Sequence, residues 1–247
     1  MQREGVLGVL GGMGPEATAY FMLLVIRLTP AKRDQDHIEM IVLNDPKIPD
    51  RTAAILEGGP SPVPRIIRDL RLLESLGVDL VAVPCNTFFY FYDQVAGSTS
   101  LPIVHMIEES AKLIYEAGVD SVGLLATSGT VEVGLYQRYL ESKGVRVTTP
   151  KNQSEVMRAI YKIKAGRKEE ARRVLLRAAK SLIEEGAQIV VAGCTEVPLV
   201  LSKDDVPLLD PMEVVARLCI DRLKGTSLTS ELRQQIRDLA CSQSSGK

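Results

Sequence analysis

Two cysteines, Cys85 and Cys194, stand at the ends of two similar apolar segments. The first segment is Asp79–Thr87, DLVAVPCNT, and the second is Ala187–Glu196, AQIVVAGCTE. Each apolar run indicates a buried strand of a parallel sheet, and each follows a helical segment that closes on a glycine. Ligands in open α/β sheets bind beyond the carboxyl ends of the strands. Each half of the chain could therefore offer one thiol to a shared site.

The side chains behind these cysteines indicate a particular chemistry. Taken singly, each cysteine is explained as well by a small apolar side chain at a strand end. Taken together, with Asn86 and Thr87 after one thiol and Thr195 and Glu196 at the matching places after the other, they indicate an acid–base pair. A helix N-terminus can lower the pKa of a thiol, which makes the thiolate a usable base and leaves a matching thiol as a usable acid. Two such groups facing one carbon would remove a proton from one face and return one to the other, as racemisation requires.

The other cysteines fit no site. Cys219 lies in a helical pattern and is expected to fill the core, and Cys241 lies in a polar stretch. No two cysteines form a CxxC pair, so zinc-ribbon and thioredoxin-type sites have no support. Only two histidines, His37 and His105, could partner a nucleophilic thiol.

A glycine-rich turn follows the first expected strand, Val6–Leu10. Its sequence is Gly11-Gly12-Met13-Gly14, followed by Pro15 at an expected helix start. The glycines do not have the GxGxxG spacing of a dinucleotide site. We expect a close-approach turn that lines a small-ligand site with backbone N–H groups.

Two cations have simple explanations from their positions alone. Arg51 follows the second expected strand in a polar loop, where a surface salt bridge or a helix-start contact would account for it. Lys164 stands just before Ala165 and Gly166, where a cation near a helix C-terminus is expected.

The order of elements repeats in the two halves of the chain. Each half reads as strand, small-residue turn, helix, strand, helix, strand and cysteine. This predicts an α/β fold with an internal duplication, in which two similar lobes each hold a parallel sheet flanked by helices. The first lobe would comprise residues 1–104 and 210–225, the second residues 105–209, and residues 226–247 would form a polar, frayed tail.

Several finer expectations concern single elements. A strand is expected at Ile103-Val104. The turn Thr127–Thr130 should open one helix that continues to about Lys143, and Ser154 should cap the next helix.

Composition excludes several classes of protein. The chain has 247 residues, is 45% hydrophobic and 25% charged, and carries a net charge of −1. These values are ordinary for a globular protein, and no basic field exists to attract nucleic acid or anionic lipid. The start of the chain lacks the apolar core of a signal peptide, and no run reaches membrane-spanning length. We expect a cytoplasmic protein with a small-molecule substrate.

A set of motifs in this order resembles a known family, the cofactor-independent aspartate/glutamate racemases. The motifs are GVLGGMGPEAT, NDPKIPDRT, VPCNT, IEE, GLLATSGT, KAG, AGCTEV and LLDPM. They cover nearly the whole chain up to about Lys224. The paired PCNT and GCTE motifs are the specific part of the resemblance, and within the family it is strongest to the members that act on aspartate.

The resemblance implies an active site in the cleft between two lobes, commonly in a homodimer. It implies that Cys85 and Cys194 are the two acid/base thiols, without pyridoxal phosphate or metal. It also implies that Arg51 and Lys164 bind the distal carboxylate, which reverses the simpler explanations given above. The remaining substrate-binding positions that it implies are Asn86, Thr87, Thr130 and Thr195, with Met13 and Gly14 lining the turn.

One residue departs from the family pattern. Phe89 stands where close relatives often carry a histidine, two places after the threonine of the first cysteine motif. This bears on the substrate more than on the reaction.

The sequence predicts a racemase that interconverts L- and D-aspartate, or glutamate. The alternatives are a maleate isomerase, a hydantoin racemase and a non-catalytic small-ligand binding protein. The pair Arg51 and Lys164 argues for a dicarboxylate over a hydantoin but does not exclude maleate.

Overall fold

The computed structural model describes residues 5–244 and divides into two compact units. One unit comprises Met1–Met106 with Met212–Thr229, and the other comprises Ile107–Pro211 with Ser230–Lys247. Each unit is built on its own sheet, and every strand pair within the two sheets is parallel. The predicted fold class, α/β with two parallel sheets flanked by helices, is confirmed.

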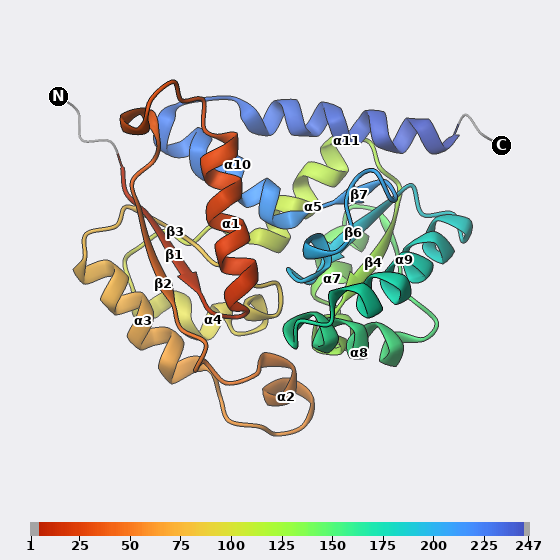
Figure 1. Cartoon of the computed structure of the whole chain (residues 1–247), viewed down its shortest axis with the longest axis horizontal. Helices are drawn as coiled ribbons and strands as arrows, with labels where there is room; N and C mark the ends of the chain where they lie inside the picture. The colour runs from red at the N-terminus through yellow and green to blue at the C-terminus, as the bar shows by residue number, and fades with distance from the viewer. Residues whose placement is uncertain (1–4, 245–247) are drawn as a thin grey trace. The chain divides into compact units, whose positions relative to one another are not determined.

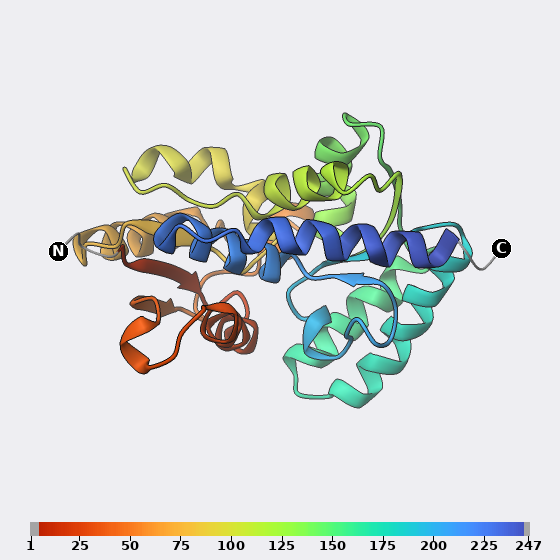
Figure 2. The same ribbon diagram turned by 90° about the horizontal axis from the view of Figure 1, so that it is seen from above.

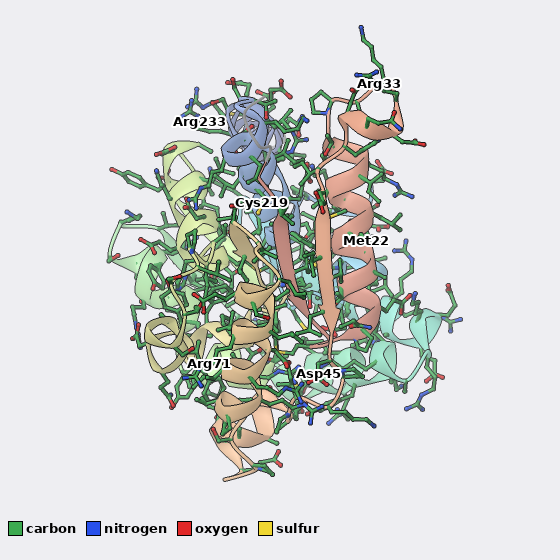
Figure 3. The ribbon with its side chains drawn as sticks, turned by 90° about the vertical axis from the view of Figure 1, so that its left-hand side faces the viewer. Met22, Arg33, Asp45, Arg71, Cys219 and Arg233 are labelled. Atoms are coloured by element: carbon green, nitrogen blue, oxygen red, sulfur yellow. The ribbon has the colours of Figure 1, made fainter. Side chains whose placement is uncertain are left out.

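The first unit holds a three-stranded sheet with β1 (Leu7–Gly11) at its centre. On its two sides lie β2 (Met40–Asn44) and β3 (Leu80–Ala82). Helices α1 (Pro15–Leu28) and α3 (Val63–Ser75) cover opposite faces of this sheet (Figure 3). All of β1 is buried, because both faces are covered, which explains its apolar sequence. The other helices of the unit are α2 (Arg51–Leu56), α4 (Tyr92–Val95) and α10 (Pro211–Lys224), with 3₁₀ turns at 34–36, 87–90 and 96–98.

The second unit holds a four-stranded sheet. In spatial order its strands are β5 (Arg146–Thr148), β4 (Ser121–Ala126), β6 (Ile189–Gly193) and β7 (Leu208–Leu209). Helices α8 (Gln153–Lys164) and α9 (Lys168–Glu184) run side by side on one side of it (Figure 1), and α5 (Met106–Glu116) lies on the other (Figure 2). The remaining elements are α6 (Ser128–Glu132), α7 (Leu135–Glu141), α11 (Leu228–Ser244) and a 3₁₀ turn at 197–199.

The strand registers show that the two sheets are copies of one plan. Gly8 of β1 lies opposite Val81 of β3, and Gly123 of β4 lies opposite Val190 of β6. Cys85 and Cys194 each come four residues after that valine. The copies differ at one edge: β7 pairs with β6, whereas the expected strand at Ile103-Val104 is reduced to a single bridge between Ile103 and Val81.

Two local predictions are corrected by the structure. The helix expected to run from the Thr127–Thr130 turn to about Lys143 is divided into α6 and α7, because Gly134 adopts a left-handed conformation with φ of 65°. The N-cap of α8 is Asn152, whose side chain accepts a hydrogen bond from the Glu155 N–H, and not Ser154.

The predicted frayed tail is also wrong for the residues that the structure describes. Most of 226–247 forms helix α11, and only residues 245–247 of that segment lie outside the described part of the chain. Leu232, Ile236 and Ala240 are buried at helical spacing. Arg233 forms an ion pair with Glu116, and Arg237 donates hydrogen bonds to backbone carbonyls at the end of α5. Apolar residues every four positions, together with these polar contacts, therefore attach an otherwise polar helix.

The glycine-rich turn after β1 is fixed by close backbone packing. Gly12 has φ of 92°, and a Cβ built there would lie 2.2–2.5 Å from backbone atoms of Asp45. The hydroxyl of Thr18 accepts a hydrogen bond from the Gly12 N–H at 2.9 Å and donates one to the carbonyl of Gly14 at 2.8 Å. Figure 3 shows Asp45 where the chain leaves β2. Only glycine satisfies both the conformation and the space at position 12.

The first prediction tests the attachment of α11. Ile236→Ala should lower the free energy of unfolding by about 2–5 kcal/mol, since it removes a buried side chain. The matched control is Gln235→Ala on the exposed face, which should change it by less than about 0.5 kcal/mol. Urea denaturation of the two variants makes the comparison, and equal midpoints would show that the helix is not docked.

The second prediction tests the glycine turn against another glycine with positive φ in the same unit. Gly58 has φ of 66° and open space around it. Gly58→Ala should cost about 1–2 kcal/mol, which is the penalty of the left-handed conformation. Gly12→Ala should cost about 1–3 kcal/mol more, because it also overpacks against Asp45. Thermal denaturation of both variants decides this, and a Gly12→Ala protein as stable as Gly58→Ala would contradict it.

Candidate active site

Cys85 lies three residues beyond the end of β3 in a tight turn. Its backbone N–H donates to the carbonyl of Val83 at 2.8 Å, and the residue is 4% exposed. Asn86 and Thr87 follow at the start of the 3₁₀ turn and are also buried. Within residues 5–244, no hydrogen bond is made by the Cys85 thiol. The sulfur is thus held in place by the backbone.

Cys194 occupies the equivalent place after β6 but has a different neighbour. The residue is 5% exposed, and its thiol donates a hydrogen bond to Glu196 Oε2 at 2.8 Å. The hydroxyl of Thr195 donates to the same oxygen at 3.4 Å. Lys164 Nζ lies 3.8 Å from the other oxygen, Oε1. Glu196 is itself only 3% exposed, so a buried carboxylate connects the thiol to a cation.

These neighbours set the charge of the Cys194 thiol. Burial raises the pKa of Cys194 well above its ordinary value, and the carboxylate of Glu196 raises it further, while Lys164 opposes the shift. Tyr136 of α7 is fully buried nearby, and its pKa is raised by burial and then by the charges of Asp210 and Cys194. The thiol of Cys194 therefore carries its proton at neutral pH.

The turn after β1 brings Met13 and Gly14 next to Arg51. Both residues of the turn are buried, and the carbonyl of Met13 accepts a hydrogen bond from Arg51 Nη2 at 3.1 Å. Asp45, just behind the turn, is held by Arg65 and Arg68 of α3, and the hydrogen bond from Arg65 lowers the pKa of Asp45 to about 2. The turn therefore packs against a residue whose carboxylate stays charged at neutral pH.

Arg51 is a buried cation held by neutral groups. It begins α2, is 7% exposed, and its Nη1 donates to the carbonyls of Pro49 at 2.9 Å and Ile48 at 3.4 Å. No carboxylate pairs with it in the described part of the chain, and its Nε is buried without an acceptor. A desolvated guanidinium without a counter-ion is costly, so this position favours an anionic ligand.

Thr130 lies in the turn that follows β4. It is fully buried, its N–H donates to Thr127 Oγ1 at 3.3 Å, and the two hydroxyls are 3.1 Å apart. Gln153 at the start of α8 donates to the carbonyl of Ala126 at the end of β4, at 2.9 Å. This is the second unit's counterpart of the glycine turn, with hydroxyl groups in place of bare backbone.

The structure gathers the predicted residues into two sets, one in each unit. Each set lies at the carboxyl ends of two adjacent parallel strands, where ligands of open α/β sheets bind. The first set, beyond β1 and β3 and on the adjoining α2, is Met13, Gly14, Arg51, Cys85, Asn86 and Thr87. The second, beyond β4 and β6 and on the adjoining α8, is Thr130, Lys164, Cys194 and Thr195.

Two neighbours of these sets were not among the predicted site residues. Glu196 is part of the second cysteine motif, at the place that Thr87 takes in the first, but the motif alone does not show its contact with the Cys194 thiol. His105 could not be found from the sequence, since only the fold places its ring beside Phe89, with 4.4 Å between ring centroids, and 4.8 Å from the ring of Tyr92. An imidazole therefore lies next to Phe89, the residue that departs from the family pattern described above.

Within residues 5–244, no cluster of three His, Cys, Asp or Glu side chains could hold a metal ion. Nor is any helix of the described part long and apolar enough to cross a bilayer.

The chain is similar in structure and in sequence to several racemases. In the solved structures, aspartate racemase of Picrophilus torridus has a TM-score of 0.86 with this chain at 30% identity, covering 95% of this chain and 99% of that one. An aspartate racemase homologue from Pyrococcus horikoshii OT3 has a TM-score of 0.71 at 27% identity, covering 90% and 99%. In sequence, the broad specificity amino-acid racemase RacX of Bacillus subtilis (strain 168) is 28% identical over 228 residues, which is 86% of this chain and 95% of RacX.

A family model matches most of the chain. The model describes Asp/Glu/hydantoin racemases and matches residues 10–219. That range includes the glycine turn, both cysteine motifs, Arg51 and Lys164. The chain therefore belongs to the Asp/Glu/hydantoin racemase family.

Proposed function

We propose that this protein is a cofactor-independent racemase of an acidic amino acid, with aspartate as first choice and glutamate as the alternative. The observation that carries the proposal is the pair Cys85 and Cys194. They lie at equivalent strand ends of a duplicated fold, both buried and each beside small polar groups. The homodimer implied by the family resemblance and the cytoplasmic location expected from composition are part of the same proposal.

In the proposed reaction the two thiols act on opposite faces of the substrate α-carbon. One thiolate removes the α-proton, and the other thiol delivers its proton to the opposite face. The roles exchange when the reaction runs in reverse. A carbon-bound proton is a very weak acid, so most of the rate must come from groups that stabilise the carbanion-like transition state. We assign this to the backbone and small polar side chains at Gly14, Asn86, Thr130 and Thr195, which act most strongly where water is excluded.

The substrate assignment depends on the two cations. Arg51 supplies a buried guanidinium without a carboxylate among the described residues, and Lys164 supplies an ammonium that is 28% exposed. We propose that a distal carboxylate of the substrate is bound by both cations. Aspartate and glutamate carry such a group and alanine does not. The similarity to RacX and the aromatic cluster around Phe89 favour a second candidate, a racemase that also accepts less polar side chains.

Deuterium exchange tests the proposal. The protein, without added cofactor, is incubated with L-aspartate in heavy water, and deuterium at Cα is measured by NMR or mass spectrometry. Uptake together with the appearance of D-aspartate is expected. No uptake from any acidic or neutral amino acid would refute the racemase proposal and favour a binding protein.

The third prediction concerns the thiols. Cys85→Ala and Cys194→Ala should each lower turnover by at least about 10²–10⁴-fold, since each removes an acid/base group from a unit that needs both. Cys219→Ala should retain activity, because Cys219 is buried in α10 and its pKa is raised by burial to about 12. Circular dichroism confirms folding of each variant. Full turnover by either Cys85→Ala or Cys194→Ala would exclude the two-thiol mechanism.

The fourth prediction concerns the distal carboxylate. Arg51→Ala and Lys164→Ala should each lower kcat/KM for aspartate by about 10–100-fold or more, as expected when one partner of a desolvated charge contact is lost. Part of the loss should appear in kcat. Lys162→Ala, a neighbour on α8 that pairs with Glu170, is the control and should have little effect.

The same assay with a panel of aspartate, glutamate, asparagine, alanine and phenylalanine separates the two candidates. If a neutral amino acid turns over best and Arg51→Ala leaves that activity unchanged, the acidic-substrate assignment is wrong even though the enzyme is a racemase.

A further inference from the structure

The two cysteine motifs differ at one position that matters for proton transfer. Two residues after Cys85 stands Thr87, and two residues after Cys194 stands Glu196. The thiol of Cys194 donates its hydrogen bond to the carboxylate of Glu196 at 2.8 Å, whereas the thiol of Cys85 makes no hydrogen bond within the described residues. A duplicated fold has thus given its two thiols unequal surroundings.

We propose that Glu196 is a positioning residue that keeps Cys194 protonated in the resting enzyme, so that Cys194 is the resting proton donor and Cys85 the resting base. This inference rests on the proposed racemase function and assigns an order to its two thiols. The contact aims the S–H bond at a fixed acceptor, and the 3% exposure of Glu196 keeps the carboxylate from being screened by water.

Two titratable groups from other helices, Lys164 and Tyr136, interact electrostatically with this thiol, and Asp210 interacts with Tyr136. Lys164, at the end of α8, contacts the second oxygen of Glu196 at 3.8 Å. Tyr136 of α7 is close enough for the charge of Cys194 to affect it, and Asp210, between β7 and α10, acts on Tyr136 in the same way. Lys164 is the cation among them, and its effect on the pKa of Cys194 is smaller than those of burial and of Glu196. The balance of these groups favours the neutral thiol.

The proton balance of one turnover follows from this arrangement. The thiolate of Cys85 takes the α-proton and becomes a thiol, while the S–H bond of Cys194 breaks and its proton forms the new C–H bond. A thiolate then remains at Cys194, 2.8 Å from the site of a second negative charge. Repulsion between them favours its return to the thiol by a proton from water, and Cys85 releases its proton to water. The enzyme regains its starting state with no net gain or loss of protons.

The fifth prediction measures the charge of Cys194 without substrate. In a Cys85→Ala background, the rate of alkylation of Cys194 by iodoacetamide is followed against pH by peptide mass spectrometry. Adding Glu196→Gln should move the midpoint of this profile down by about one to three pH units, because a nearby like charge is removed. Glu196→Asp keeps the charge, so its midpoint should lie close to that of the protein with Glu196. Ultraviolet absorbance of the thiolate gives the same midpoint independently of access by the reagent.

A second variant, expected to shift the midpoint in the opposite direction, shows whether the result for Glu196→Gln reflects charge and not a folding defect. Lys164→Ala removes the neighbouring cation, so the midpoint should move up, and Lys162→Ala on the same helix should not move it. In the protein with both thiols, Glu196→Gln should also shift the alkaline limb of the pH–rate profile to lower pH, since the donor loses its proton earlier.

These results separate the two proposals. Alkylation midpoints that do not move, or that move up in Glu196→Gln and down in Lys164→Ala, would overturn the role of Glu196 whatever the activity. A protein that shows no deuterium exchange but does show the expected midpoints would refute the racemase proposal and leave the charge relation of Glu196 and Cys194 standing.

Discussion

Parallel pairing of β1 with β3, and of β4 with β6, is the constraint on which both halves of the site depend. In a parallel sheet the carboxyl ends of neighbouring strands lie at the same edge. The turn that follows the central strand and the cysteine that follows its neighbour must therefore lie near each other in each unit. The central strands are buried on both faces, and a shift by one residue would bring larger side chains to the places where Gly8 packs against Val78 and Gly123 against Leu182.

The parts of the fold that could be predicted are those with a strong local signal. Pro15 at a helix start, the apolar run Ser121–Ala126 and the repeated order of elements are visible in the sequence, and the structure has them at the expected places. The errors arose where a tertiary contact decides. Helix α11 looks like a polar tail because few of its residues are apolar, and the buried ones, Leu232, Ile236 and Ala240, are four positions apart. Gly134 divides a helix because it adopts a left-handed conformation that nothing in the periodicity requires.

The site shows the same division between local and distant information. The cysteines and the glycine turn were found because their neighbours in sequence are also their neighbours in space. Arg51 was explained by position alone as a surface residue, yet it is buried and bound to the carbonyl of Met13, which is 38 residues away. Lys164 and Glu196 are likewise 32 residues apart, and the spacing of residues in the sequence does not indicate their contact. Burial and charge pairing at a site are properties of the folded chain, so the sequence motif shows which residues matter but not their state.

The unequal surroundings of the two thiols have a geometric reason under the proposed function. The planar carbanion of an amino acid is symmetric by reflection through its plane, but two copies of a protein fold can be related only by rotation, since reflection would require D-residues. A rotation that exchanges the two faces of the carbanion leaves at most one of its three substituents in place and exchanges the other two.

The carboxylate, the ammonium and the side chain are chemically different, so a duplicated scaffold must differ between its halves wherever it contacts them. The chain differs in this way among the proposed binding groups: Arg51 is in one unit and Lys164 in the other, and bare glycine backbone follows β1 where hydroxyls follow β4. Once the binding groups differ, the thiols cannot keep equal pKa values by symmetry. Under the proposed order of the thiols, Glu196 in the place of Thr87 raises the pKa of Cys194, so Cys194 is the proton donor.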